Sequence, residues 1–302
     1  MIRRSASWSF RPCRLPRAIA HPAFLVAAAI MALLGGVASV DAAQETTGRW
    51  LDAEGNALPF QDDAAITEFL RSAEVVGNEK IDVGITAPRH LTLESDGVRV
   101  DAAFRYVDET HSRVRLADGT YFQKLRDYCG FEVAAYQLSL MLDMDNIPPA
   151  VHRKLGRDDG TVQIWVANTM MEKDRVDQGL RSPNGLEWGR QIQEMLVLDE
   201  LFGNVDRNPG NMLIDSEWKV WLIDHTRAFQ QGEELKNPAR IRMIRKAFWE
   251  ALQNLDEDTV TAAVSNELDG NNIRDMFKRR DLLVAHIQGL IDQRGEGAVV
   301  WE

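Results

Sequence analysis

The stretch Leu201-Phe-Gly-Asn-Val-Asp206-Arg-Asn-Pro-Gly-Asn211-Met-Leu-Ile-Asp215, with the segment Val220-Trp-Leu-Ile-Asp224-His-Thr226 that follows it, decides the fold. Four residues separate Asp206 from Asn211, and Asp224 ends the next apolar run. A carboxylate can accept the proton of an attacking hydroxyl, and carboxylate and amide oxygens are suitable ligands of Mg²⁺. The spacing therefore predicts one cleft in which Asp206 is a base and Asn211 and Asp224 bind a metal ion.

A surface turn is the simpler explanation of the same residues. The run Asn208-Pro-Gly-Asn211 has the composition of a turn in any loop, and Asp224 alone would be an ordinary acid at the end of a strand. The joint spacing favours the chemical interpretation. We expect the neighbouring His225 to pack or to form hydrogen bonds instead of acting as a base. Asp199, in the preceding helix, either braces this loop or faces solvent.

The composition allows a large core and argues against nucleic acid as a partner. The chain has 302 residues, 45% of them hydrophobic, which suffices for one large or two modest domains. Its net charge is −11, but the first 42 residues hold five arginines and one acid. The remainder has 30 basic and 45 acidic residues, a net charge of −15. A body this acidic repels nucleic-acid phosphates.

The N-terminus is typical of an export signal. Arginines precede the apolar run Phe24–Val40, and Val40-Asp-Ala42 offers the small residues of a cleavage site. We expect residues 1–42 to be a signal peptide that is cleaved after Ala42. The alternative is an uncleaved anchor, because the apolar run is at the short end of spanning length. The protein is then exported, either periplasmic or tethered to the inner membrane by this segment and facing the periplasm.

The patterning of the body predicts an α+β fold with two lobes. Residues 43–63 are polar and turn-rich and are expected to form a flexible leader. Residues 64–170 contain alternating, strand-like segments and one helix over Phe131–Leu142, and they are expected to form the N-lobe. Residues 171–302 show mainly helical spacing and are expected to form the C-lobe.

Three segments resemble the atypical kinase superfamily, which includes bacterial HipA-type kinases, phosphoinositide lipid kinases and secretory-pathway kinases related to Golgi casein kinase. Glu132-Val-Ala-Ala-Tyr-Gln-Leu138, followed by Ile147-Pro-Pro-Ala-Val151, resembles the regulatory helix and its Pro-Pro exit. Asn204-Val-Asp206-Arg-Asn-Pro-Gly-Asn211 resembles the catalytic loop, with Arg after the Asp. Leu222-Ile-Asp224-His225 stands where typical protein kinases have Asp-Phe-Gly.

This resemblance, which spans about residues 81–229, implies a two-lobed protein-kinase-like fold with ATP and Mg²⁺ as cofactors. It implies transfer of the γ-phosphoryl group to a hydroxyl acceptor, which is protein Ser/Thr, a sugar or a lipid head group. Backbone groups near Val166, in the expected inter-lobe strand, would hold the adenine. Gly84 would cover the phosphates, although the chain lacks a Gly-x-Gly-x-x-Gly loop.

The family's phosphate-binding lysine has two candidates here. Lys124 is the first candidate and would form an ion pair with Glu132, eight residues later. Arg105 is the second, because Ala102-Ala-Phe-Arg105 matches the family's Ala-x-Phe-Lys strand with Arg at the key position. Arg is a planar fork where Lys is a compact point charge, so the two are not equivalent at a phosphate site. If Arg105 has this role, the second hairpin is an insertion and Lys124 faces solvent.

Two alternatives belong to other functional classes. One is a catalytically degenerate pseudokinase that acts as a nucleotide- or partner-binding module in the cell envelope. The missing Gly-rich loop, the unsettled lysine and the low ATP content of a bacterial periplasm motivate it. The other is a membrane-tethered scaffold without a nucleotide site.

Overall fold

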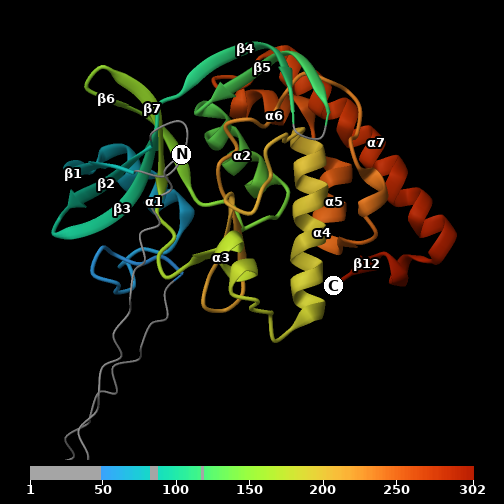
Figure 1. The fold of residues 1–302 in the computed structure, drawn as a ribbon, viewed down its shortest axis with the longest axis horizontal. Helices are drawn as coiled ribbons and strands as arrows, with labels where there is room; N and C mark the ends of the chain where they lie inside the picture. Colours follow the sequence, from blue (N-terminus) through green and yellow to red (C-terminus); the bar gives the residue numbers. More distant parts are fainter. Residues whose placement is uncertain (1–48, 82–87, 117–118) are drawn as a thin grey trace, which may run out of the picture. The chain divides into compact units, whose positions relative to one another are not determined.

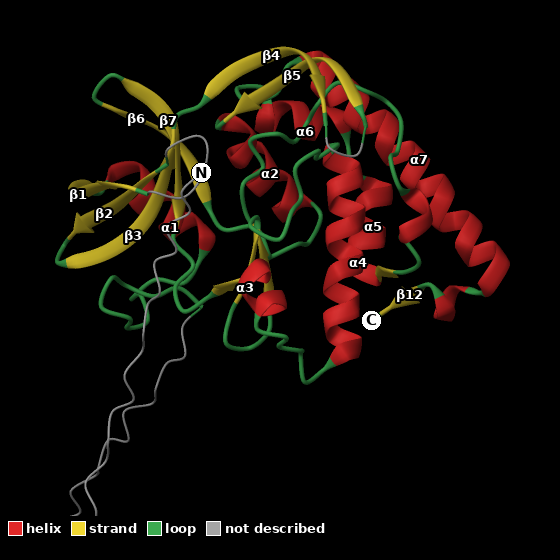
Figure 2. Ribbon diagram, viewed as in Figure 1, coloured by secondary structure: helices red, strands yellow, loops and turns green. Residues whose placement is uncertain are grey.

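The computed structural model describes residues 49–81, 88–116 and 119–302 (Figure 1). The expected signal peptide and Gly84 lie outside the described residues. Within this part of the chain, no helix is both long and apolar enough to cross a membrane. Strands predominate in the first half and helices in the second (Figure 2), which confirms the α+β class expected from the sequence.

A five-stranded antiparallel sheet with the order β1-β2-β3-β7-β6 organises the first half. Its strands are β1 (Glu74–Lys80), β2 (Arg89–Ser95), β3 (Val98–Arg105), β6 (Ala150–Leu155) and β7 (Asp158–Ile164). Successive side chains of a strand point to opposite faces of the sheet. In β3 this alternation buries Val100, Ala102 and Phe104 in the core. Ala103 and Arg105 consequently face the other side, where they line a cavity.

Residues 49–62 pack into the core of this half. Trp50 is 1% exposed and Leu58 is 4% exposed, and both join the cluster that contains Phe69 of helix α1 (Asp63–Ser72). The Gln61 side chain connects the two ends of this segment. It accepts a hydrogen bond from the Trp50 N–H and donates one to the Trp50 carbonyl, each 2.9 Å long. The prediction of a flexible leader is therefore wrong for residues 49–63, the part of it that the structure describes. Burial of a tryptophan and a leucine holds this segment against the sheet half.

Helix α2 (Gly130–Met141) is buried on nearly all sides, packed against β6, β7 and α6, and it confirms the helix expected in this region. Between β3 and α2 the chain forms a separate antiparallel pair, β4 (Asp108–Arg115) and β5 (Tyr121–Tyr128). This hairpin runs over the helical half (Figure 1), where the Lys236 Nζ lies 5.2 Å from the Phe122 ring centroid. The second hairpin is thus an insertion outside the main sheet.

The second half is largely helical and has its own hydrophobic core, which also includes α2. Its elements are β8 (Met170–Met171), α3 (Glu172–Asp177), α4 (Gly185–Phe202), β9 (Met212–Ile214), β10 (Val220–Leu222), η1 (Pro238–Arg240), β11 (Ile244–Arg245), α5 (Lys246–Asn254), α6 (Glu257–Val264), α7 (Gly270–Arg294), η2 (Glu296–Ala298) and β12 (Val300–Trp301). Helix α4 ends at Gly203, which has a left-handed φ of 58° as its position predicts.

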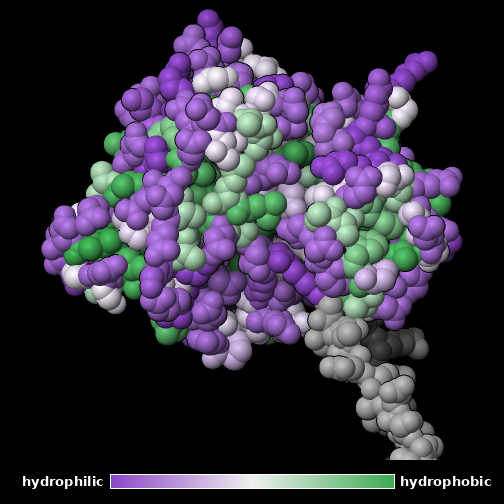
Figure 3. Space-filling model, turned by 180° about the vertical axis from the view of Figure 1, so that it is seen from behind, coloured by the Kyte–Doolittle hydropathy of each residue, from purple (hydrophilic) through white to green (hydrophobic). Residues whose placement is uncertain are grey.

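Two hydrophobic clusters, one under the sheet and one among the helices, are the basis of the two-lobed arrangement. The position of the lobe boundary at residues 170/171 stays a prediction. The face shown in Figure 3 carries mostly hydrophilic residues, with apolar residues in separate patches.

Candidate active site

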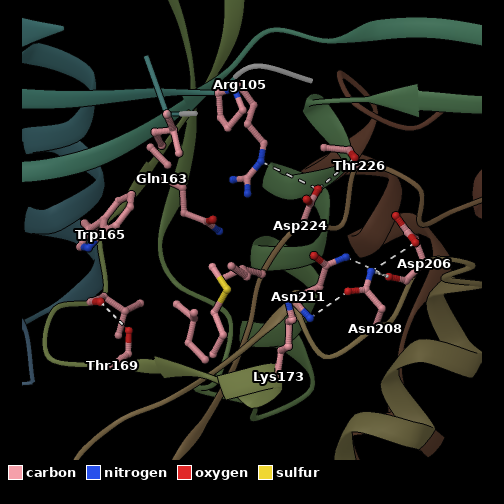
Figure 4. A pocket seen from close by; sticks show the side chains of 18 of the residues that line it. Arg105, Gln163, Trp165, Thr169, Lys173, Asp206, Asn208, Asn211, Asp224 and Thr226 are labelled. Carbon is pink, nitrogen blue, oxygen red and sulfur yellow. Dashed lines mark hydrogen bonds and ion pairs between the residues drawn. The ribbon is translucent and has the colours of Figure 1, made fainter. Parts of the chain in front are cut away.

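A cavity of about 690 Å³ opens between the five-stranded sheet and the β9–β10 hairpin (Figure 4). This volume is typical of sites for small ligands and cofactors. Of the residues singled out from the sequence, five line it: Asp206, Asn211, Asp224, Arg105 and Val166. Asp206, Asn211 and Asp224 therefore line one cavity, as their spacing predicted, and the more distant Arg105 and Val166 line it as well.

The β9–β10 hairpin brings Asn211 and Asp224 together. Asn211 directly precedes β9, and Asp224 follows β10 by two residues, and the antiparallel register pairs Met212 with Leu222. Antiparallel pairing places the start of one strand beside the end of its partner. The Ile223 N–H accordingly donates to the Asn211 carbonyl at 3.2 Å. Both side chains therefore reach the same wall of the cavity (Figure 4).

Asp224 has a left-handed backbone conformation with a φ of 59°. Aspartate tolerates this region better than most residues with a Cβ. The Thr226 hydroxyl donates to Asp224 Oδ1 at 3.1 Å and so fixes the carboxylate from the side. A strained backbone that is held in this way is a common property of functional sites.

Asp206 lies next to Asn211, whose amide nitrogen donates to the Asp206 carbonyl at 2.9 Å. The Asp206 carboxylate also forms an ion pair with Arg227, with 3.2 Å between Oδ2 and Nη1. Burial raises the pKa of Asp206, and the positive charge of Arg227 opposes this effect. Asp206 is thus a partly buried carboxylate with a raised pKa, a combination suited to proton transfer.

For a divalent cation the cavity offers the Asp224 carboxylate and the Asn211 Oδ1, because the amide nitrogen of Asn211 is already engaged. These hard oxygen donors suit Mg²⁺, which usually takes phosphate oxygens and waters as its other ligands. Among the described residues, no group of three His, Cys, Asp or Glu side chains is placed to hold a metal ion. The donor set therefore fits a cation that arrives together with phosphates.

Of the two candidates for the phosphate-binding cation, Arg105 lines this cavity and Lys124 does not. The side chain of Arg105 is 11% exposed, and its Nε lies 3.9 Å from Asp224 Oδ1. This buried Nε has no hydrogen-bond partner within the described part of the chain. Lys124 lies on β5, where Leu125 and Asp127 point inward, so the alternation of the strand turns Lys124 outward into solvent.

The expected ion pair between Lys124 and Glu132 is consequently wrong. Glu132 is fully buried on α2 and accepts hydrogen bonds from the His225 N–H (2.6 Å), from the His225 Nδ1 (3.1 Å) and from the Gln163 Nε2 (3.0 Å). Burial alone would raise the pKa of Glu132, but His225 and Arg105 lower it to about 2. The carboxylate is therefore ionised and satisfied without a lysine.

Arg207 is a structural residue that sequence reasoning missed. Its guanidinium donates to both Asp199 oxygens, at 3.3 Å and 3.0 Å from Nε, and to the Asn211 carbonyl at 2.6 Å from Nη1. It also donates to the Ile223 carbonyl at 3.0 Å. The available signal was the position of this Arg directly after Asp206. Of the two expectations for Asp199, bracing of the loop is the one found.

The lining of the cavity also includes an apolar part. Its apolar lining residues are Ile81, Pro88, Ala103, Ile164, Val166, Met170, Met171, Leu213 and Ile223. The Val166 carbonyl accepts a hydrogen bond from the Thr169 hydroxyl at 3.2 Å. Val166 and Thr169, in the segment after β7, thus line the cavity in the part of the chain for which the family resemblance implies adenine contacts.

The five-stranded antiparallel sheet joined to a largely helical second half has the overall fold of solved kinase-like structures. Comparison with solved structures identifies the proteins that share it. A structure of hydra Fam20 with sugar matches with a TM-score of 0.61 and 13% identity, covering 82% of this chain and 94% of that chain.

Golgi casein kinase matches with a TM-score of 0.57 and 16% identity, covering 80% of this chain and 78% of that chain. The same kinase with Mn/ADP bound matches with a TM-score of 0.57 and 15% identity, covering 79% and 78%. No protein-family model and no curated protein sequence matches the chain. At these identities the likeness establishes the fold, and the predicted kinase-like architecture is confirmed.

Proposed function

We propose that this protein is an ATP-dependent phosphotransferase that transfers the γ-phosphoryl group to a hydroxyl acceptor. The observation that carries the proposal is the meeting of Asp206, Asn211, Asp224 and Arg105 at one cavity of nucleotide size. A base, two oxygen ligands and a buried cation are the parts that phosphoryl transfer requires. The solved kinase with Mn/ADP bound shares this fold and supports nucleotide and divalent metal as cofactors.

In this proposal each side chain has one task. Asp224 and the Asn211 Oδ1 would hold Mg²⁺, which neutralises charge on the phosphates when bound. Arg105 donates to the non-transferred phosphates, and Asp206 accepts the proton of the acceptor hydroxyl as its oxygen bonds to phosphorus and ADP leaves. Arg227 holds the Asp206 carboxylate in place through their ion pair. Most of the rate gain then comes from positioning and charge neutralisation.

The acceptor class is protein Ser/Thr, a sugar or a lipid head group, and each has the hydroxyl that the chemistry needs. We also propose that the protein is exported and acts in the periplasm or at the inner membrane, with the N-terminal segment as the source of membrane association. The basic residues and apolar run before Ala42 support this localisation.

The test is phosphoryl transfer by the full chain. The purified protein is incubated with γ-labelled ATP, Mg²⁺ or Mn²⁺ and acceptors of each class, in parallel with Asp206→Asn and Asp224→Asn. Asp177→Asn, an exposed acid at the end of α3, is the matched control. We expect transfer by the wild type and by the control, and a loss of at least about 100-fold in both site variants. Equal labelling by wild type and Asp224→Asn would refute the assignment.

A pseudokinase that binds nucleotide without turnover is the second candidate. Arginine replaces the usual lysine, and Glu132 is occupied by His225 and Gln163, so the familiar Lys–Glu pair does not exist here. Thermal unfolding with and without nucleotide and metal distinguishes the two functions. Nucleotide at 100 times Kd stabilises a protein by about 2.7 kcal/mol. A metal-dependent shift without transfer to any acceptor supports the binding module, and no shift at all removes both candidates.

A further inference from the structure

His225, next to Asp224, is a fully buried histidine that joins three elements of the site. Its backbone N–H and its ring Nδ1 both contact the Glu132 carboxylate on α2, at 2.6 Å and 3.1 Å. Its Nε2 lies 2.9 Å from Nη2 of Arg207 in the catalytic loop. One residue therefore connects the metal-binding loop, the catalytic loop and helix α2.

The partners of the ring indicate which of its nitrogens donates a hydrogen bond. A guanidinium has only hydrogen-bond donors, so the His225 Nε2 must be the acceptor for Arg207. The remaining nitrogen, Nδ1, then carries the proton and donates to Glu132. This geometry predicts that the Nδ1 hydrogen points at Glu132 and that the Nε2 lone pair points at the guanidinium.

The chain of contacts continues beyond the ring. Arg207 donates to Asp199 on α4 at 3.0 Å and to the carbonyls of Asn211 and Ile223, which flank the metal-binding hairpin. On the other side, Glu132 accepts from Gln163 on β7. A line of hydrogen bonds through His225 thus runs from the helical half to the sheet, behind the two metal-ligand candidates.

We propose that His225 is a positioning residue that fixes the metal-binding geometry of Asp224 and Asn211, in the place where a lysine–glutamate ion pair would otherwise connect sheet and helix. The inference rests on the proposed function, because the groups it positions are those assigned to the metal. Two hydrogen bonds from one residue to one carboxylate fix the orientation of that residue. The left-handed Asp224 peptide, adjacent in the chain, is fixed with it.

In this arrangement, different residues satisfy the Glu132 carboxylate and bind an anion in the cavity. Glu132 is satisfied by His225 and Gln163, so Arg105 needs no hydrogen bond to that carboxylate and keeps its Nε for an anion in the cavity. Removal of the His225 ring leaves the Arg207 Nη2 without this acceptor and the Glu132 Oε1 with one donor fewer. Both losses occur behind the metal ligands and not in contact with the nucleotide.

The first test reads the tautomer directly and does not depend on activity. The imidazole ¹⁵N resonances of the six histidines are recorded in the full-length protein, and His225 is assigned by its absence in His225→Phe. We expect a protonated, pyrrole-like Nδ1 and an unprotonated, pyridine-like Nε2. A ring that carries its only proton on Nε2 in the folded protein would overturn the proposal.

The second test removes the two contacts of the ring, to Glu132 and to Arg207, one at a time. The side-chain amide nitrogen of asparagine reaches the position of the histidine Nδ1, so His225→Asn keeps the donor to Glu132. Glutamine is longer, so His225→Gln places its amide oxygen near Arg207 as a replacement for the Nε2 acceptor. His225→Phe preserves volume and loses both contacts. His152→Asn, on an exposed histidine of β6, is the control. The readouts are the apparent affinity for Mn²⁺ in the presence of ADP and the affinity for ADP without metal.

We expect His225→Phe to weaken the apparent metal affinity by about 10- to 100-fold, as for other residues that orient metal ligands. His225→Asn and His225→Gln each recover part of the loss, and metal-free ADP binding changes less than about threefold in all variants. A merely structural histidine gives another pattern: a lower melting temperature with wild-type metal affinity. That result would refute the positioning role.

A further measurement tests the role of His225 even if the proposed phosphotransferase function is wrong. If the wild type shows no response to metal and ADP, amide hydrogen exchange of the ligand-free protein replaces the binding readout. The proposal then requires faster exchange in His225→Phe at the β9–β10 hairpin and at α2, with no change at α7. Unchanged exchange in these two elements would exclude His225 as a positioning residue.

Discussion

Arg105 points across the cavity toward Asp224, with 3.9 Å between the guanidinium Nε and the carboxylate Oδ1. The distance is too long for a hydrogen bond, and the Nε has no other partner among the described residues. A buried donor without a partner costs free energy. The arrangement is therefore expected to be completed by an anionic ligand that Arg105 and the metal-binding carboxylate hold between them.

Arg105→Ala is expected to weaken nucleotide binding by at least about tenfold, because hydrogen bonds to charged groups contribute about 1.5–3 kcal/mol. Arg105→Lys should recover only part of this affinity, since lysine lacks the planar fork of the guanidinium. Lys124→Ala is the matched control and should leave the affinity unchanged, because its side chain is exposed on the inserted hairpin. Calorimetric titration with ADP and Mn²⁺ measures all three. A larger effect at Lys124 than at Arg105 would return the role to the lysine.

Arg227→Gln is expected to move the acid limb of the activity profile to higher pH. Burial raises the pKa of Asp206, and Arg227 counteracts the rise, so removal of that charge raises the pKa further. A base must be ionised to act, so activity is lost as pH falls through its pKa. Initial rates of transfer across pH measure the shift. Arg126→Gln, which removes an exposed partner of Asp108, should leave the profile in place.

The low pKa of Glu132 predicts that the free energy of unfolding decreases in acid. Its folded-state pKa of about 2 lies below the ordinary value of 4.5, so the unfolded state binds the proton more readily. Its contribution to the free energy of unfolding is therefore complete above about pH 4.5 and disappears as pH falls toward 2. Urea unfolding of wild type and Glu132→Gln should show a difference that shrinks over this window. A difference that is constant from neutral to acid pH would contradict the buried, ionised state.

Gly203→Ala is expected to destabilise the protein by about 1–2 kcal/mol or more, because Gly203 ends α4 with a φ of 58°. A Cβ at this position would also lie 2.9 Å from the Arg279 Cζ. Gly189→Ala in the same helix meets nothing within 4 Å and should stabilise by about 0.5–1 kcal/mol. Thermal unfolding of the two variants should therefore show shifts of opposite sign. An unchanged or raised melting temperature in Gly203→Ala would indicate that the end of α4 does not need glycine.

The local signals in the sequence were sufficient for the elements and for one wall of the site. Helical spacing located α2 and indicated that the second half is mainly helical. The four-residue spacing of Asp206 and Asn211 and the position of Asp224 placed these residues at one cavity. These predictions succeeded because they depend on short-range geometry: the periods of helix and strand and the register of a tight hairpin.

Contacts between residues far apart in the chain were decided only by the tertiary structure. The sequence could not show that Arg105 lines the cavity while Lys124 faces solvent, because this depends on which strands join the main sheet. Nor could it show that Glu132 accepts from His225, 93 residues away, or that Trp50 belongs to the core. Composition and periodicity determine which side chains need burial or a charge partner. Which partner each one meets depends on the packing of the whole chain.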